Sequence, residues 1–260
     1  MMKVIKFAVV VCFVISCDQK ENSTQRVQTA DDKSEAFEVR MTVEHDPNAF
    51  TQGLVYHQGN IIESTGGDDS WIAKYDIASG QYEKKVSLDQ NYFGEGITIL
   101  HDKLYQLTWK NNVGFVYDVN TFEKIGEFTY DFEGWGITHD NHHLIISDGT
   151  DKLHYFDTLN WQKVSTKSVK NYNRKTSNLN ELEFIEGFIY ANQWQTNRIL
   201  KLATGPFEVF KVLDLVYLAK AVARINPQAD VLNGIAYNPD NQDIFITGKL
   251  WPRSYILRLK

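Results

Sequence analysis

Hydrophobic and polar residues alternate over short stretches along most of the chain, and no long stretch has the period of a helix. Alternation occurs, for example, in Ala73 to Asp76, Gly114 to Asp118 and Leu153 to Asp157, each of which ends in an aspartate. A period of two is typical of a strand with one buried face. Polar turns such as His57 to Asn60 and His101 to Lys103 separate the stretches. The pattern predicts an all-β protein of many short strands.

The strand patterns recur in a fixed order, and each recurrence is marked by a glycine, or its replacement, before an apolar pair. These positions are Gly53, Gly96, Gly136, Glu181 and Gly234, at intervals of 43, 40, 45 and 53 residues. Each unit carries four short strand patterns, which at this period is typical of a β-propeller. We therefore predict a five-bladed β-propeller over residues 37–260, with four antiparallel strands per blade. A large β-sandwich is the alternative, but it does not explain the fivefold register.

Two segments lie outside the regular repeat. Leu213 to Ala223 lengthen the fourth interval and predict a short helix between blades four and five. Phe37 to Val43 predict an extra strand before the first blade, whereas the last repeat has no fourth strand after Tyr255 to Leu259. Because an open ring would expose strand edges, we predict that the N-terminal strand completes the last blade.

The N-terminus has the pattern of an export signal. Lys3 and Lys6 precede an apolar run from Phe7 to Ile15, which is far shorter than the roughly 20 residues needed to span a bilayer. The run ends in Val14-Ile15-Ser16-Cys17, which resembles a bacterial lipobox, where the cysteine is lipidated and becomes the new N-terminus. We predict a signal peptide over residues 1–16 and lipidation of Cys17. Ordinary cleavage near Ser16, with an incidental cysteine, is the alternative.

The residues after Cys17 are polar and charged, and this composition cannot bury a core. We therefore expect a flexible tether over residues 17–36 between the lipid and the folded domain. Diacylglycerol together with an N-acyl chain would anchor the protein stably. The expected location is the bacterial cell envelope, on the exported side of a membrane, with the lipid as the membrane contact.

Composition narrows the classes of partner and chemistry. The chain has 27 Lys and Arg against 33 Asp and Glu, which gives a net charge of −6. It therefore lacks the excess of basic residues that binding to nucleic acid requires. The 2 Cys are Cys12 and Cys17, and neither remains as a free thiol for catalysis if the signal is removed and Cys17 is lipidated. The segment His139 to His143 crosses a predicted hairpin turn, where a solvated turn is favoured over a zinc site. We expect a monomer without a metal or cofactor.

The register of the repeat brings together one set of residues at the mouth of the ring. In a propeller the innermost strands line the channel, so the residues just before each marker glycine should converge. These residues are Gln52, Glu95, Trp135, Asn180 and Asn233, and Trp109, Trp194 and Lys249 align with one another beyond the next strand. Glu95 is a carboxylate between two glycines, and a buried carboxylate must be paired or used. By contrast, Phe115, Phe156 and Trp161 are predicted to pack the blades.

Several motifs together resemble the plant-type glutaminyl-peptide cyclotransferases over about Val43 to Leu259. They are Phe50-Thr51-Gln52-Gly53-Leu54, Phe93-Gly94-Glu95-Gly96, Gly134-Trp135-Gly136 with Ser147-Asp148-Gly149, Leu179-Asn180-Glu181-Leu182-Glu183 and Thr247-Gly248-Lys249-Leu250-Trp251-Pro252. The resemblance implies a five-bladed propeller that converts the N-terminal glutamine of a peptide or protein to pyroglutamate and releases ammonia. This chain departs from the family's usual pattern at Gly66 to Ser70 and at Glu133, which stands where the family usually has aspartate.

The resemblance also implies a set of site residues. Glu95 corresponds to the family's proton-transfer group, and Gln52, Asn180 and Lys249 are candidate donors to the oxyanion. An aromatic box that would hold the glutamine side chain curled consists of Phe50, Phe93, Trp109, Trp135 and Trp194. A propeller fold is also compatible with two other functional classes. A non-catalytic propeller that binds peptides or glycans is the main alternative, and a calcium-dependent lactonase would require several inward carboxylates.

Overall fold

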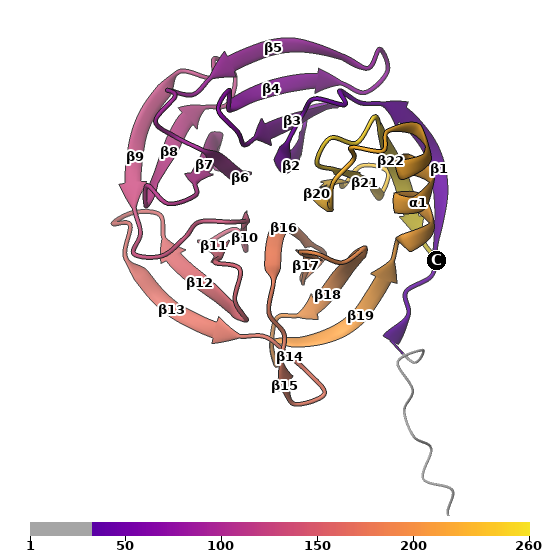
Figure 1. Cartoon of the computed structure of the whole chain (residues 1–260). Coiled ribbons are helices and arrows are strands. Elements are labelled where there is room, and N and C mark those ends of the chain that lie inside the picture. The colour runs from indigo at the N-terminus through magenta and orange to yellow at the C-terminus, as the bar shows by residue number, and fades with distance from the viewer. Residues whose placement is uncertain (1–32) are drawn as a thin grey trace, which may run out of the picture. The chain divides into compact units, whose positions relative to one another are not determined.

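The computed structural model describes residues 33–260, and the predicted signal peptide and Cys17 lie outside the described residues. The strands of this part form five sheets, which are arranged as blades around a central axis (Figure 1). The predicted all-β, five-bladed propeller is confirmed. Each blade has four antiparallel strands from the axis to the rim, and a small hairpin extends the fourth blade.

The blades follow one another in chain order. Blade one consists of β2 (Thr51–His57), β3 (Asn60–Thr65), β4 (Trp71–Asp76) and β5 (Gln81–Ser87). Blade two consists of β6 (Gly94–Leu100), β7 (Lys103–Thr108), β8 (Val113–Asp118) and β9 (Lys124–Thr129), and blade three of β10 (Ile137–His139), β11 (His143–Ser147), β12 (Lys152–Asp157) and β13 (Lys163–Ser168). Blade four consists of β16 (Leu179–Ile185), β17 (Phe188–Gln193), β18 (Arg198–Ala203) and β19 (Glu208–Asp214). Blade five consists of β20 (Leu232–Asn238), β21 (Asp243–Gly248), β22 (Arg253–Leu259) and β1 (Phe37–Glu44).

The hydrophobic core lies between the faces of neighbouring blades. Between blades one and two, for example, Ile62 and Ile72 pack with Ile97, Leu104 and Phe115. The three inner strands of a blade are buried on both faces, whereas the outermost strand has one exposed face, as in β5. The alternating stretches that end in aspartate lie instead in the third strands β4, β8 and β12, which are largely buried.

The ring closes as the sequence predicts. β1 pairs antiparallel with β22, from Phe37 opposite Leu259 to Glu44 opposite Arg253. Figure 1 shows β1 as the outer strand of the blade that contains the C-terminus. The N-terminal strand therefore supplies the fourth strand of blade five and covers the edge of β22 that would otherwise be exposed.

The predicted helix is present, a few residues later than expected, as α1 (Val216–Ile225). Leu218 and Val222, one turn apart, are its buried residues and pack against Trp251 and Tyr255 of blade five. No helix among residues 33–260 is long and apolar enough to cross a membrane. His139 to His143 form the predicted hairpin turn, in which the Asp140 carboxylate accepts the backbone N–H groups of His142 and His143.

Two features of the fourth blade were not predicted. The hairpin of β14 (Lys170–Asn171) and β15 (Arg174–Lys175) joins the outer edge of β19 through one parallel pair, Lys170 with Glu208. Residues 33–36, which we assigned to the tether, also contact this edge. Ser34 forms a bridge with Val212, and the Glu35 carboxylate pairs with Lys201 at 3.2 Å. The contacts with the propeller thus begin before β1, because blade four offers an unpaired outer edge.

Candidate active site

Nine of the residues selected from the sequence line one cavity of about 280 Å³. They are Phe50, Gln52, Phe93, Glu95, Trp109, Trp135, Asn180, Trp194 and Lys249. Six of them lie at or just before the start of an innermost strand, and three lie directly after the second strand of their blade. The predicted convergence of these residues is therefore observed, although their chemical roles are a separate question. Asn233, which shares their register, does not line the cavity.

Irregular strand pairing aims the polar side chains toward the axis. The pairing of β2 with β3 shifts between Thr51 and Gly53, which leaves Gln52 in the irregular step. The equivalent shifts leave Glu95 with Gly96 in blade two and Asn180 with Glu181 in blade four. A bulge of this kind re-aims a side chain and ends regular pairing locally. The small residue after Glu95 is required by close packing, since a Cβ at Gly96 would lie 2.8 Å from the Trp135 carbonyl oxygen.

Glu95 is the carboxylate within the cavity lining, and only 4% of the residue is exposed. Burial raises the pKa of its carboxyl group well above the usual value, Lys249 opposes this shift, and Glu133 adds to it. Among residues 33–260 no hydrogen-bond donor is fixed on the side chain, so it is available to a ligand. A buried carboxyl group with a raised pKa can both accept and return a proton near neutral pH.

A chain of hydrogen bonds holds the backbone at Glu95. The Ser64 hydroxyl donates to the Glu95 carbonyl oxygen at 2.6 Å, and Gln106 Nε2 donates to the Ser64 hydroxyl at 2.8 Å. The Tyr117 hydroxyl in turn donates to Gln106 Oε1 at 3.1 Å. All of these side chains are buried. The chain therefore fixes the position of the Glu95 backbone while the carboxyl group remains free to act.

Lys249 supplies the cationic group of the cavity. It is 6% exposed, and its Nζ lies 4.6 Å from the centre of the Phe50 ring. Burial lowers the pKa of the Lys249 ammonium group, whereas Glu95 and Asp230 raise it. An ammonium beside a carboxyl group gives the site one group of each sign within an otherwise aromatic wall.

The aromatic walls are locked by edge contacts and by one carboxylate at the rim. The rings of Phe93 and Trp109 lie 5.6 Å apart, and those of Trp135 and Trp194 lie 5.4 Å apart and nearly perpendicular. Glu133 Oε2 accepts both indole N–H groups, from Trp109 at 2.8 Å and from Trp135 at 3.3 Å. In the sequence, Glu133 stands out only as a departure from a family pattern. Its position directly before Gly134-Trp135 was the available signal for a role in orienting both rings.

The amide side chains are not equivalent. Asn233 Nδ2 donates to Gln52 Oε1 at 3.3 Å and to the Thr51 carbonyl oxygen at 3.1 Å. Because the oxygen of Gln52 is engaged in this way, its Nε2 is the group left to donate into the cavity. Asn180 Oδ1, by contrast, is buried without a hydrogen-bond partner among the described residues. Asn233 is thus a residue that orients Gln52 from outside the cavity.

Glu181 occupies the position that is glycine in the other four repeats. It is 1% exposed, and its Oε1 accepts the backbone N–H of Leu54, across the axis, at 3.3 Å. Burial, with Glu183 adding to it, raises the pKa of the Glu181 carboxyl group well above its usual value. The side chain therefore joins blade four to blade one in the space that the glycines leave. The replacement of glycine is visible in the sequence, but this contact between blades is not.

Comparisons with known proteins agree on one group of relatives. A family model described as glutamine cyclotransferase matches residues 8–259. The chain is 40% identical over 231 residues to a glutaminyl-peptide cyclotransferase of Arabidopsis thaliana, which covers 86% of this chain and 71% of that protein. The crystal structure of the Myxococcus xanthus glutaminyl cyclase superposes with a TM-score of 0.82 at 36% identity, covering 87% of this chain and 97% of that one.

Proposed function

The chain belongs to the glutamine cyclotransferase family, and from that premise we propose how its cavity closes the pyroglutamate ring, with Glu95 as the proton shuttle. As a glutaminyl-peptide cyclotransferase, it converts the N-terminal glutamine of a peptide to pyroglutamate and releases ammonia. The observation that carries the proposed mechanism is the single buried carboxyl group in an aromatic cavity beside one lysine.

The first task of the cavity is conformational. The α-amine of glutamine must reach the carbon of its own γ-carboxamide, so the side chain must be curled rather than extended. Phe50, Phe93, Trp109, Trp135 and Trp194 enclose the cavity and leave apolar walls that favour a compact side chain. Holding the reacting atoms in an attack geometry removes much of the entropic part of the barrier.

The second task is proton transfer. The amine nitrogen forms a bond to the amide carbon and gives a proton to the Glu95 carboxylate. The resulting carboxyl group then donates that proton to the amide nitrogen, the bond between this nitrogen and the carbon breaks, and ammonia leaves. One group with a raised pKa can serve both steps in turn, since it is neither too weak a base nor too weak an acid near neutral pH.

The third task is to stabilise the negative charge that develops on the amide oxygen. Gln52 Nε2 and the Lys249 ammonium are the donors that the cavity offers most directly, and Asn180 also lines it. Preorganised donors of this type contribute a large share of the rate enhancement in acyl-transfer enzymes. Because Asn233 fixes Gln52, we assign Gln52 the oxyanion role before Asn180.

The test of this function is direct. Purified protein is incubated with a peptide that begins with glutamine, and we expect release of ammonia together with loss of one ammonia mass from the peptide. The same peptide with an acetylated N-terminus is the control, because its blocked amine cannot attack. Binding of the free peptide without any release of ammonia would favour the non-catalytic class instead.

Trp109→Ala should weaken substrate binding and turnover together. The change removes one wall of the cavity and one of the two indole groups that Glu133 orients. We expect KM to rise about tenfold and kcat to fall about tenfold, because part of the binding free energy is used to curl the substrate. The measurement is steady-state cyclisation of a glutamine-initiated peptide.

Trp161→Ala is the matched control for this experiment. Trp161 stacks on Phe128 between blades, with ring centres 4.8 Å apart, and does not line the cavity. Its loss should lower the melting temperature and leave KM within about twofold of the wild type. Equal changes of KM in both variants would contradict the assignment of Trp109 to the substrate wall.

We also propose that the enzyme is exported and anchored to the bacterial cell envelope through a lipid on Cys17. Support comes from the apolar run that ends in Val14-Ile15-Ser16-Cys17 and from the polar residues that follow it. Cys17→Ser should move the protein from the membrane fraction to the soluble fraction after export, with its cyclisation activity unchanged. Identical fractionation of the two proteins would rule out the anchor.

A further inference from the structure

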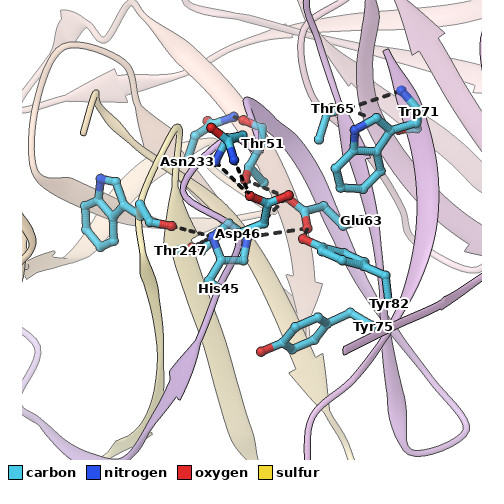
Figure 2. Close-up of polar contacts among 12 residues, drawn as sticks. His45, Asp46, Thr51, Glu63, Thr65, Trp71, Tyr75, Tyr82, Asn233 and Thr247 are labelled. Atoms are coloured by element: carbon cyan, nitrogen blue, oxygen red, sulfur yellow. Dashed lines mark hydrogen bonds and ion pairs between the residues drawn. The ribbon is translucent and has the colours of Figure 1, made fainter. Parts of the chain in front are cut away.

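A buried pair of ionisable residues lies outside the cavity, at the seam where blade five meets blade one (Figure 2). His45 directly follows β1, and Glu63 lies on β3. His45 is 7% exposed and Glu63 is 1% exposed. His45 Nε2 lies 3.3 Å from Glu63 Oε1 and 3.4 Å from Oε2. The mechanism described above uses neither residue.

The hydrogen-bond partners define the protonation of His45. Its Nδ1 lies 2.6 Å from the carbonyl oxygen of Trp251, which can only accept. Its Nε2 faces the Glu63 carboxylate, which already accepts the hydroxyl groups of Thr51 at 2.6 Å and Tyr82 at 2.5 Å. With Glu63 ionised, both ring nitrogens face oxygen acceptors, and only the doubly protonated imidazolium can donate to both. The contacts alone describe a charged pair.

The other groups around His45 do not oppose this charge. Blade one contributes the Tyr75 ring at 6.5 Å, and the pKa of Tyr75 and of Tyr82 is raised by burial, so both keep their protons. Asp46 and Glu44 flank His45 in the chain, and blade five contributes the neutral Thr247 and Ser254. Burial by itself lowers the pKa of His45, but Glu63, the Trp251 carbonyl and Asp46 outweigh it, and the net direction is upward.

The pair holds both backbone segments that carry polar groups into the cavity. On the blade-one side, Glu63 binds Thr51, the neighbour of Gln52, while Asn233 binds the Thr51 carbonyl oxygen. On the blade-five side, His45 binds the carbonyl of Trp251, two residues after Lys249, and its own backbone N–H donates to the Pro252 carbonyl at 3.0 Å. Gln52 and Lys249 are thus tied to the same buried charge pair from opposite sides of the seam.

We propose that His45 and Glu63 are positioning residues, which act as an imidazolium–carboxylate pair across the seam and hold Gln52 and Lys249 at the spacing that ring closure requires. The proposal rests on the roles given to Gln52 and Lys249 above. Neither member of the pair touches the substrate. The pair links blade five, which the N-terminal strand completes, to blade one, which bears the first cavity residues.

The charge state is tested without reference to activity. In protein labelled with ¹⁵N-histidine, the signals of His45 are identified by their absence from the spectrum of His45→Gln. We expect both ring nitrogens of His45 to remain protonated at a pH where free histidine has lost its charge. A neutral His45 ring under these conditions would overturn the proposal, whatever the enzyme's activity.

The positioning role is tested by kinetics. His45→Gln and Glu63→Gln should each lower kcat about tenfold and leave KM within about threefold, because misplaced donors weaken the transition state more than the ground state. His143→Gln, in a solvated hairpin turn, is the matched control and should match the wild type in both constants. A lower melting temperature with unchanged kcat would show a purely structural pair and overturn the positioning role.

Tyr82→Phe is a milder variant that serves if the other two do not fold. It keeps the pair but removes one hydrogen bond to Glu63 Oε2. The carboxylate should then hold the His45 proton more strongly, so the midpoint of His45 titration should move to higher pH. An unchanged or lower midpoint of the His45 titration would contradict the inference that Tyr82 and His45 share the Glu63 carboxylate. Absence of ammonia release in all variants and in the wild type would instead contradict the proposed function, and the NMR result would still decide the pair.

Discussion

Glu95→Gln should reduce turnover about 10² to 10⁴-fold, while substrate affinity changes little. The substitution keeps the size and hydrogen-bonding shape of the side chain but removes the group that accepts and returns the proton. General acid–base catalysis contributes a factor of this order, about 3 to 5 kcal/mol of barrier. The measurement is steady-state cyclisation of a glutamine-initiated peptide. A folded variant within threefold of the wild-type kcat would remove Glu95 from the proton transfer.

The pH dependence of the two proteins provides a second readout. Because burial raises the pKa of Glu95, the wild-type activity should rise with pH well above the range in which an exposed glutamate titrates. The residual activity of the Gln variant should lack this rise. Folding is the control, and we expect the melting temperature of the variant to equal or exceed that of the wild type. The reason is that a neutral amide is easier to bury than a carboxylate, and burial already disfavours the ionised form of Glu95.

Deletion of the chain through Val43 should cost on the order of 5 kcal/mol of unfolding free energy, which is much of the stability of a typical domain. The deletion removes the ladder between β1 and β22 and the buried side chain of Val43, and it exposes the edge of β22. Chemical denaturation monitored by tryptophan fluorescence measures the loss.

The matched control for this deletion removes residues 18–32 alone. It stops before Lys33 because Ser34 and Glu35 contact blade four, as described above. The sequence of these residues is polar, so their removal should leave the unfolding free energy within about 0.5 kcal/mol of the wild type. Equal losses in the two deletions would contradict closure by the N-terminal strand.

Much of the cavity could be predicted because its residues occupy equivalent positions in the repeats. The second strands of blades two, four and five end at Thr108, Gln193 and Gly248. The residue that follows each of them lines the cavity, namely Trp109, Trp194 and Lys249. Equivalent positions in equivalent blades must face the same end of the channel, so alignment of the repeats was enough to group them. Glu95, Asn180 and Gln52 also occupy equivalent positions, although the irregular pairing that aims their side chains is not visible in the sequence.

The elements that were missed carry weak local signals. The strands β14 and β15 have two residues each, which is too short for any period to be read. Lys33 to Glu35 belong to a polar segment, and their contacts depend on an outer edge of blade four that is distant in the sequence. Glu133 looks like any exposed acid before a glycine, and its role follows from the two indole groups that meet it.

Local patterns along the chain are enough to predict the number of blades, the order of the strands, the closing strand and the residues of the cavity. These properties depend on local alternation and on the register of a repeat, and each repeat contains the information for its own blade. In blades one to four, the order of the four main strands needs no contact beyond neighbours in the chain, whereas blade five takes its outer strand from the N-terminal segment.

Contacts between polar groups across the ring, by contrast, depend on how the blades are assembled. Glu181 reaches Leu54 from 127 residues away, Asn233 reaches Gln52 from 181, and His45 reaches the Trp251 carbonyl from 206. No periodicity relates such partners, because closure of the ring sets their distance after every blade has taken its place. For the same reason the protonation of His45, Glu95 and Glu181 follows from burial and from partners that the folded ring supplies.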